Sequence, residues 1–100
     1  MKNNKIALIT GARGGIGKAM IKRFAEEHFN IIACTRNRDI DFTAYLNSLE
    51  DKYNIETYEA FFDATDIETM KVEVKRVIKE TGGVDVLVNN AGVAHGGLFA

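Results

Sequence analysis

Four glycines within seven residues constrain the fold of this chain more than any other feature. They stand at positions 11, 14, 15 and 17 of the stretch LITGARGGIG at residues 8–17, directly after an apolar run. Glycine loses more conformational freedom on folding than other residues, so a chain uses it where a turn is tight or where another group approaches the backbone closely. The stretch therefore predicts a special turn between a strand and a helix.

The hydrophobic pattern along the chain alternates between two periodicities. Short apolar runs predict strands over residues 5–10, 30–35, 55–62 and 84–90. Apolar residues at helical spacing predict helices over residues 15–28, 41–54 and 66–83, the last capped by Asp66. The predicted buried faces of these helices consist of Ile16, Met20 and Phe24, then Phe42, Tyr45, Leu46 and Leu49, then Met70, Val74, Val77 and Ile78. Alternating strands and helices with continuously apolar strands are typical of a parallel sheet covered by helices on both faces.

The predicted topology is a single α/β unit over residues 1–100. Because parallel crossovers are right-handed, we expect a doubly wound parallel sheet of the Rossmann type, with its strands in the order 3-2-1-4. Its ligand crevice would open between strands 1 and 4. The last predicted strand is apolar although it lies at the edge of the sheet, and the chain ends on GGLFA. We therefore expect an incomplete domain whose open edge is covered by further chain or by another subunit.

Composition argues against several kinds of partner. Thirteen basic and fourteen acidic residues leave a formal charge of −1, which argues against a nucleic-acid surface. The apolar run at residues 6–9 is too short for a signal peptide or a membrane span, so we expect a cytoplasmic protein without membrane contact. Cys34 is the one cysteine, and its apolar neighbours predict a buried hydrophobe rather than a reactive thiol. No cluster of Cys, His, Asp and Glu has metal-ligand spacing, so no metal site is predicted.

The glycine turn also predicts an anion site. A helix that begins near Gly15 directs unpaired backbone N–H groups toward the turn, and such a helix N-terminus suits a pyrophosphate. Gly11 would permit the tight turn, Gly15 would leave room beside the ligand, and Gly17 would let the helix pack closely. The alternative is a plain strand–helix turn whose glycines serve geometry alone.

Most phosphate-binding motifs do not match this turn. The fingerprint G-x-G-x-x-G fails because Met20 stands at its third glycine position. The P-loop G-x-x-x-x-G-K-[ST] would need a glycine at Ala12 and a metal-binding hydroxyl at Ala19. The motif that matches is T-G-x-x-x-G-x-G, formed by Thr10, Gly11, Gly15 and Gly17.

Together with the sequence NNAG at residues 89–92, this motif resembles the short-chain dehydrogenase/reductase family. Gly11, Gly14 and Gly17 also satisfy the G-x-x-G-x-x-G of the family's extended branch, whereas NNAG favours the typical branch, to which 3-oxoacyl-[acyl-carrier-protein] reductases belong. The resemblance covers the whole chain. It implies the N-terminal, cofactor-binding portion of an oxidoreductase that transfers hydride between a nicotinamide cofactor and a carbonyl or alcohol substrate. It also implies a homo-oligomer for the full-length parent.

Within this resemblance, Arg36 predicts the choice of cofactor. It stands nineteen residues after Gly17, where relatives specific for NAD carry an aspartate. A guanidinium matches a 2′-phosphate in charge and geometry, so we expect NADP(H) in preference to NAD(H). Arg13 in the turn would add a second positive charge, and Asp39 is an alternative partner for a ribose hydroxyl. The alternative is that residues 36–39 form only a solvated turn.

The resemblance implies the remaining cofactor contacts. Asp63 corresponds to the aspartate that bonds the adenine amino group, with Ala64 behind it. Asn89 and Asn90 would tie the end of the fourth strand to its neighbours through their side-chain amides, and Ala91 and Gly92 would leave room for the nicotinamide ribose. The alternative is that the two asparagines only stabilise the sheet. The predicted cofactor site comprises Gly11, Arg13, Gly15, Ile16, Gly17, Arg36, Asp63, Ala64, Asn90, Ala91 and Gly92.

No catalytic residue is predicted in this chain. The family's catalytic tyrosine precedes a lysine by four positions, whereas the residues four positions after Tyr45, Tyr53 and Tyr58 are Leu49, Thr57 and Phe62. Two interpretations stay open. The first is the cofactor-binding portion of an NADP(H)-dependent oxidoreductase, inactive by itself. The second is a stand-alone dinucleotide-binding or interaction module without catalysis.

Overall fold

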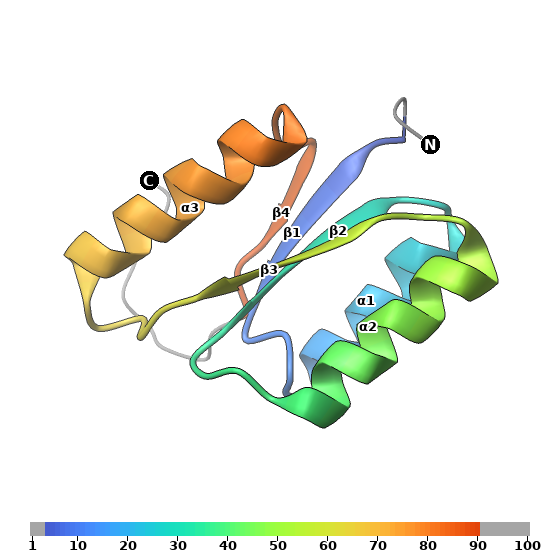
Figure 1. Ribbon diagram of the computed structural model, residues 1–100, viewed down its shortest axis with the longest axis horizontal. Helices are drawn as coiled ribbons and strands as arrows, with labels where there is room; N and C mark the ends of the chain where they lie inside the picture. The colour runs from blue at the N-terminus through green and yellow to red at the C-terminus, as the bar shows by residue number, and fades with distance from the viewer. Residues whose placement is uncertain (1–3, 91–100) are drawn as a thin grey trace.

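The computed structural model describes residues 4–90 and contains one four-stranded sheet in the order β3-β2-β1-β4 (Figure 1). All three neighbouring strand pairs are parallel. The strands are β1 (Ile6–Thr10), β2 (Asn30–Thr35), β3 (Thr57–Phe61) and β4 (Val86–Val88). The helices are α1 (Gly15–Glu26), α2 (Ile40–Tyr53) and α3 (Ile67–Thr81). The predicted fold class and strand order are confirmed, with β3 and β4 shorter than predicted.

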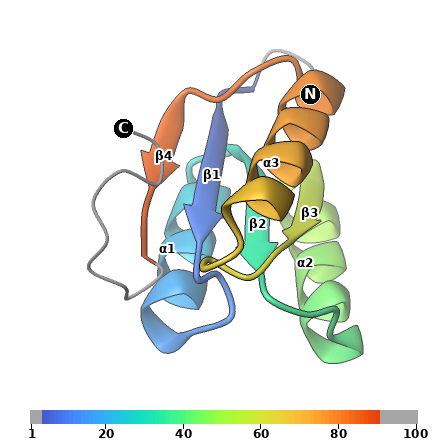
Figure 2. The same cartoon turned by 90° about the vertical axis from the view of Figure 1, so that its left-hand side faces the viewer.

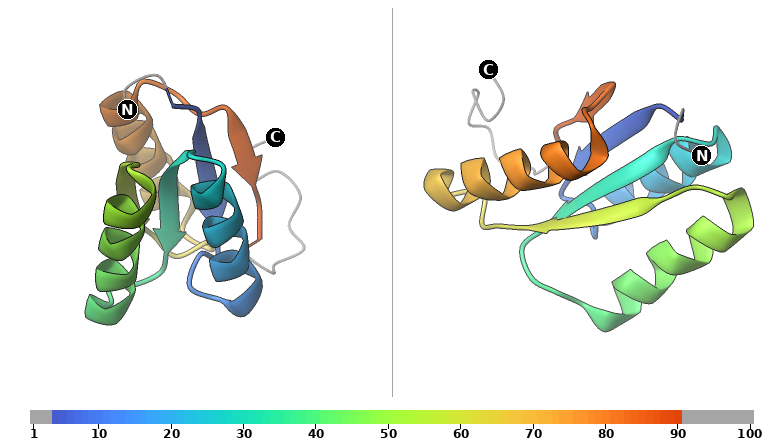
Figure 3. Two further views of the ribbon diagram at one scale, coloured as in Figure 1. Left: turned by 90° about the vertical axis from the view of Figure 1, so that its right-hand side faces the viewer. Right: turned by 45° about the horizontal axis from the view of Figure 1, so that its top comes forward.

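The sheet separates two layers of helices, with α1 and α2 on one face and α3 on the other (Figures 1 and 3). Ala7 and Ile9 of β1 pack with the first pair of helices, whereas Ile6 and Leu8 pack on the side of α3. Successive side chains of a strand point to opposite faces, so both faces of a doubly covered strand need apolar residues. Every residue of β1 and β2 is accordingly buried.

The buried face of α1 differs from the predicted one by one position. Gly17, Ile21 and Ala25 are buried, whereas Ile16 is 69% exposed. Met20 and Phe24 are partly buried and pack at the side of the core. The prediction of Ile16 on the buried face was wrong because Gly17 must face the preceding loop, which turns its larger neighbour outward.

The other two helices begin with aspartate caps. The Asp39 carboxylate accepts a hydrogen bond from the Phe42 N–H at 2.9 Å, and Asp66 accepts one from the Thr69 N–H at 3.1 Å. Such caps satisfy backbone donors that have no partner within the helix. The prediction of Asp66 as a cap is confirmed.

Most of the predicted face of α2 and half of that of α3 are buried. Phe42, Leu46 and Leu49 are buried in α2, and Tyr45 packs against the same cluster. In α3, Met70 and Val77 are buried and Val74 is partly buried. The prediction that Ile78 is buried was wrong, because its side chain lies at the margin of the α3 face and is exposed.

Cys34 is buried in β2 on the α3 side of the sheet. Burial raises the pKa of its thiol to about 12, with the nearby Glu73 carboxylate adding to the effect. The prediction that Cys34 is buried is confirmed. Within residues 4–90, no helix combines the length and apolarity that a membrane crossing requires.

The close approach of α1 to the glycine loop predicts the effect of one substitution. A Cβ added at Gly17 would lie 2.2 Å from the Gly11 carbonyl oxygen and 2.9 Å from Ala12 Cα. Because these obstacles are backbone atoms, Gly17→Ala should lower the free energy of unfolding by about 2–3 kcal/mol, measured by urea denaturation. Gly15→Ala is the matched control, since a Cβ there meets nothing within 4 Å, and it should change the value by less than about 1 kcal/mol. Equal losses in the two variants would contradict the packing role of Gly17.

Candidate functional site

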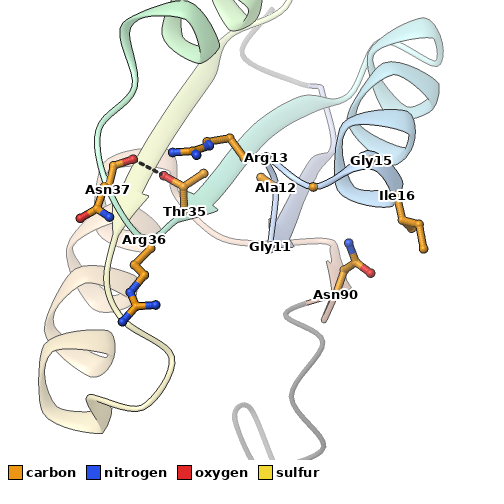
Figure 4. Close-up of a pocket in the computed structure, with 10 residues that line it drawn as sticks. Gly11, Ala12, Arg13, Gly15, Ile16, Thr35, Arg36, Asn37 and Asn90 are labelled. Atoms are coloured by element: carbon orange, nitrogen blue, oxygen red, sulfur yellow. Dashed lines mark hydrogen bonds between the residues drawn. The ribbon is translucent and has the colours of Figure 1, made fainter.

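A crevice of about 520 Å³ opens where β1 and β2 end (Figure 4). Parallel strands place their carboxyl ends at the same edge of the sheet, and Figure 2 shows β1 and β2 ending side by side. The crevice is lined by Gly11, Ala12, Arg13, Gly14, Gly15, Ile16, Thr35, Arg36, Asn37 and Asn90. Residues that follow β1 and β4 therefore line the crevice, as predicted, and the end of β2 contributes as well, so the crevice is not confined to the space between β1 and β4.

Six of the predicted site residues line the crevice. The six are Gly11, Arg13, Gly15, Ile16, Arg36 and Asn90. Gly17 packs against the backbone of Gly11 and Ala12. Asp63 and Ala64 lie in the loop that follows β3. Ala91 and Gly92 lie outside the described residues. Thr35 and Asn37 also line the crevice without having been predicted, and their place next to Arg36 at the tip of a strand was the available signal.

The glycine loop has the tight geometry that the sequence predicted. Gly11 adopts a φ of +60°, in the left-handed region that glycine tolerates best. The Gly14 N–H donates to the Gly11 carbonyl at 3.2 Å and closes the turn. The Ala12 N–H donates to the Cys34 carbonyl at 3.1 Å, which ties the loop to the end of β2. Gly15 lines the crevice, and the space beside its Cα is open.

The N-terminus of α1 points its free backbone donors at this crevice. Its N-cap residue is Gly14, which has no side chain to accept a hydrogen bond, and its first turn carries no acidic residue. By contrast, α2 and α3 are capped by Asp39 and Asp66. Within the described part of the chain, no side chain caps the first turn of α1, where Gly15 and Ile16 line the crevice. Unpaired N–H groups and the positive end of the helix dipole together favour an anion.

Two arginines flank the tip of β2, and each is paired with a carboxylate. Arg36 Nη2 donates to Asp63 Oδ2 at 2.7 Å, and Arg13 Nη1 lies 3.5 Å from Asp39 Oδ2. Figure 4 shows Arg13 beside Thr35 and Arg36 extending away from it. Asp39 therefore serves as a helix cap and as the partner of Arg13 at once.

Asp63 is held by its own loop as well as by Arg36. Its Oδ1 accepts hydrogen bonds from the Thr65 N–H at 2.9 Å and from the Thr65 hydroxyl at 2.7 Å. These hydrogen bonds, assisted by the positive charge of Arg36, lower the pKa of the Asp63 carboxyl below its usual value. The carboxylate is therefore ionised at neutral pH. The sequence placed Arg36 and Asp63 in one site without predicting that they touch.

A buried threonine joins the end of β4 to β1. The Thr10 hydroxyl donates to Asn89 Oδ1 at 3.1 Å and accepts from the Asn90 N–H at 2.7 Å. The Asn89 side chain thus stabilises the sheet, whereas Asn90 lines the crevice. Among residues 4–90, no group of His, Cys, Asp and Glu side chains is placed to hold a metal ion.

Comparison with known proteins gives the same relationship from sequence and from structure. The family model for short chain dehydrogenase matches residues 5–100. A 3-oxoacyl-[acyl-carrier-protein] reductase of Staphylococcus aureus is 32% identical over 99 residues, which cover 99% of this chain and 40% of the relative. The chain thus spans about two fifths of the length of that curated relative.

Solved structures of two reductases superpose on the described fold. L-sorbose reductase from Gluconobacter frateurii, complexed with NADPH and L-sorbose, has a TM-score of 0.79 and 34% identity, covering 92% of this chain and 35% of its own. A 3-oxoacyl-[acyl-carrier protein] reductase from Brucella melitensis, in complex with NAD, has a TM-score of 0.80 and 30% identity, covering 91% and 34%. These two relatives were therefore crystallised with different nicotinamide dinucleotides.

The Thr10 network predicts a measurable loss of stability. Thr10→Val keeps the shape of this buried side chain but leaves the Asn90 N–H and the Asn89 amide without their partner. The free energy of unfolding should fall by about 1–3 kcal/mol, measured by urea denaturation. Thr35→Val is the matched control, because the Thr35 hydroxyl is also buried in a strand and makes one hydrogen bond, to the Asn37 carbonyl. A loss at Thr35 as large as that at Thr10 would contradict the special role of Thr10.

Proposed function

The chain belongs to the short-chain dehydrogenase family, and on that premise we propose that its crevice binds NADP(H). The observation that carries the proposal is the convergence of an uncapped helix N-terminus and a guanidinium on one cavity of about 520 Å³. A dinucleotide phosphate carries negative charge at two separate places, the diphosphate and the 2′-phosphate. The crevice offers a donor of the right kind for each.

The residues present fit the pyrophosphate at the start of α1. Gly15 and Ile16 line the cavity, and the space beside Gly15 Cα is open, so a phosphate approaches the backbone without meeting a side chain. The absence of an acidic residue from the first turn removes the repulsion that a carboxylate would cause. Gly11 and Gly17 hold the loop and the helix in this arrangement.

The residues at the tips of β2 and β3 fit the adenosine end of the cofactor. Arg36 borders the cavity, and a guanidinium binds a phosphate through more than one N–H group. We assign the adenine to the neighbourhood of Asp63 and Ala64, which follow β3. Arg13 adds positive charge on the other side of the β2 tip, although its distance to Asp39 shows that part of this charge is already balanced.

At the opposite end of the crevice, we assign the nicotinamide ribose to the neighbourhood of Asn90. The family resemblance adds Ala91 and Gly92 to this assignment. When bound, the nicotinamide supplies or accepts a hydride. The chain's own residues bind and orient the cofactor, and no residue of the sequence forms the family's Tyr-x-x-x-Lys pair. We therefore propose that residues 1–100 form the dinucleotide-binding portion of an oxidoreductase that acts on a small carbonyl or alcohol compound, in a cytoplasmic homo-oligomer.

The preference for NADP(H) over NAD(H) is the finer part of the proposal. NAD(H) has a hydroxyl in place of the 2′-phosphate, and a hydroxyl gains little from a guanidinium that already has a carboxylate partner. A charge-assisted hydrogen bond contributes about 1.5–3 kcal/mol, which corresponds to roughly tenfold to a hundredfold in affinity. Arg36 is the side chain that we expect to supply it.

Substitution of Arg36 tests this assignment. Arg36→Ala should raise the Kd for NADPH roughly tenfold to a hundredfold and leave the Kd for NADH nearly unchanged, because only NADPH carries the 2′-phosphate. Nicotinamide fluorescence titration or calorimetry measures both constants. Arg38→Ala is the matched control, since Arg38 is also near the end of β2 but lies over the Phe61 ring and does not line the crevice. Equal losses for the two cofactors in Arg36→Ala would refute the assignment.

A turnover measurement tests whether this chain binds the cofactor without catalysing carbonyl reduction. We expect the purified 100-residue chain to bind NADPH but to show no carbonyl-reducing turnover, because its sequence carries no Tyr-x-x-x-Lys pair. Oxidation of NADPH is followed by absorbance with a panel of small carbonyl compounds. Measurable turnover would contradict the expectation.

The coding DNA beyond Ala100 distinguishes the oxidoreductase portion from the stand-alone module. A downstream Tyr-x-x-x-Lys favours the oxidoreductase, and a stop codon favours a stand-alone dinucleotide-binding module.

A further inference from the structure

The ion pair between Arg36 and Asp63 joins the tips of β2 and β3 beside the crevice. Arg36 Nη2 and Asp63 Oδ2 are 2.7 Å apart, and the two side chains are 74% and 35% exposed. Within residues 4–90, Asp63 is the one hydrogen-bond partner of the Arg36 side chain. The guanidinium that borders the cavity is thus engaged by an anion that belongs to the chain itself.

The Asp63 carboxylate is the fixed member of this pair. Its other oxygen, Oδ1, accepts hydrogen bonds from the backbone N–H and the hydroxyl of Thr65. Those two contacts hold the carboxylate in the loop after β3 whatever Arg36 does. Arg36 is the longer and more exposed side chain, so it is the partner that moves when another anion enters the crevice.

We infer that Asp63 limits the preference of this chain for a phosphate-bearing cofactor by competing with the 2′-phosphate for Arg36. The inference rests on the proposed function. In the absence of a 2′-phosphate the guanidinium is bound to Asp63, and NADPH must displace or share this contact, whereas NADH leaves it intact. Asp63 is thus a specificity-determining residue that acts through Arg36.

The charges determine the direction of the effect. A 2′-phosphate carries more negative charge than a carboxylate, so it competes successfully for the guanidinium. The anchored carboxylate stays nearby, however, and repels the phosphate. An exposed ion pair of this kind is worth up to about fivefold in an equilibrium constant, and the penalty falls on NADPH alone.

A purely adenine-binding role for Asp63 predicts a different result. Both cofactors contain the same adenine, so loss of an adenine contact raises the two dissociation constants by the same factor. The ratio of the Kd for NADH to the Kd for NADPH therefore isolates the effect exerted through Arg36. The ratio of the constants for 5′-AMP and 2′,5′-ADP does so without the nicotinamide half.

The test compares four forms of the 100-residue chain: wild type, Asp63→Asn, Arg36→Ala and the double variant. In Asp63→Asn the amide oxygen still accepts from Thr65, while the charge and the acceptor facing Arg36 are lost. We expect both ratios to rise about twofold to fivefold in Asp63→Asn. In the Arg36→Ala background, the same substitution should leave the ratios unchanged.

The matched control is Asp66→Asn, which removes an equal charge three residues away. Asp66 bonds to Thr69 at the start of α3 and has no contact with Arg36, so its ratios should equal those of wild type. Thermal denaturation checks that every variant is folded. If Asp63→Asn does not fold, Asp63→Ser takes its place.

The possible outcomes separate the two proposals. Unchanged ratios in Asp63→Asn, a rise of equal size in Asp66→Asn, or a rise that persists without Arg36 would overturn the competition. Falling ratios would also overturn it, because they would mean that Asp63 orients Arg36 toward the phosphate. Wild-type protein that binds none of the four nucleotides would instead refute the proposed function, and the inference with it.

Discussion

The arrangement of this molecule depends on the contact between Gly17 and the loop at Gly11 and Ala12. The backbone of α1 approaches that loop so closely that no side chain fits between them. Because the loop is itself bonded to the end of β2 through Ala12, the contact fixes the helix relative to two strands. Its N-terminal turn is thereby directed at the space beyond the ends of the strands, where ligands of parallel α/β sheets bind.

The same contact explains the unusual charge distribution of the crevice. Because its N-cap residue is Gly14, α1 has no capping side chain, whereas α2 and α3 are capped by Asp39 and Asp66. The positive helix end is thus available to a ligand. The two arginines that flank it are not left free, because each lies beside a carboxylate. The crevice combines uncompensated backbone donors with side-chain charges that are balanced inside the protein.

This combination separates affinity from selectivity. In the proposed function, the backbone donors at α1 bind the diphosphate, which is common to all dinucleotides. In the same proposal, selectivity between dinucleotides depends on the exposed Arg36, whose ion pair with Asp63 contributes at most about 1 kcal/mol. Under this proposal, substitutions of these exposed side chains would change cofactor preference without changing the fold. Two relatives of similar structure were solved with NADPH in one case and with NAD in the other.

What the sequence by itself determined is local. The apolar runs and the helical spacing predict all seven elements of the described chain, and the glycine turn predicts one wall of the crevice. Each signal comes from residues a few positions apart, and periodicity reports such relations well. Hydrophobic periodicity was misleading at Ile16, because the buried face of α1 contains Gly17 and Ala25, and glycine and alanine contribute little to a hydrophobic pattern.

Only the tertiary structure decided which charges meet. Arg36 and Asp63 lie 27 positions apart, and Arg13 and Asp39 lie on different elements, so neither pair follows from spacing along the chain. Their contacts depend on the register of β2 against β3 and on where the loops turn after each strand. A carboxylate that caps a helix, as Asp66 does, is readable in the sequence, whereas the contact between Asp39 and Arg13 is set by packing in three dimensions.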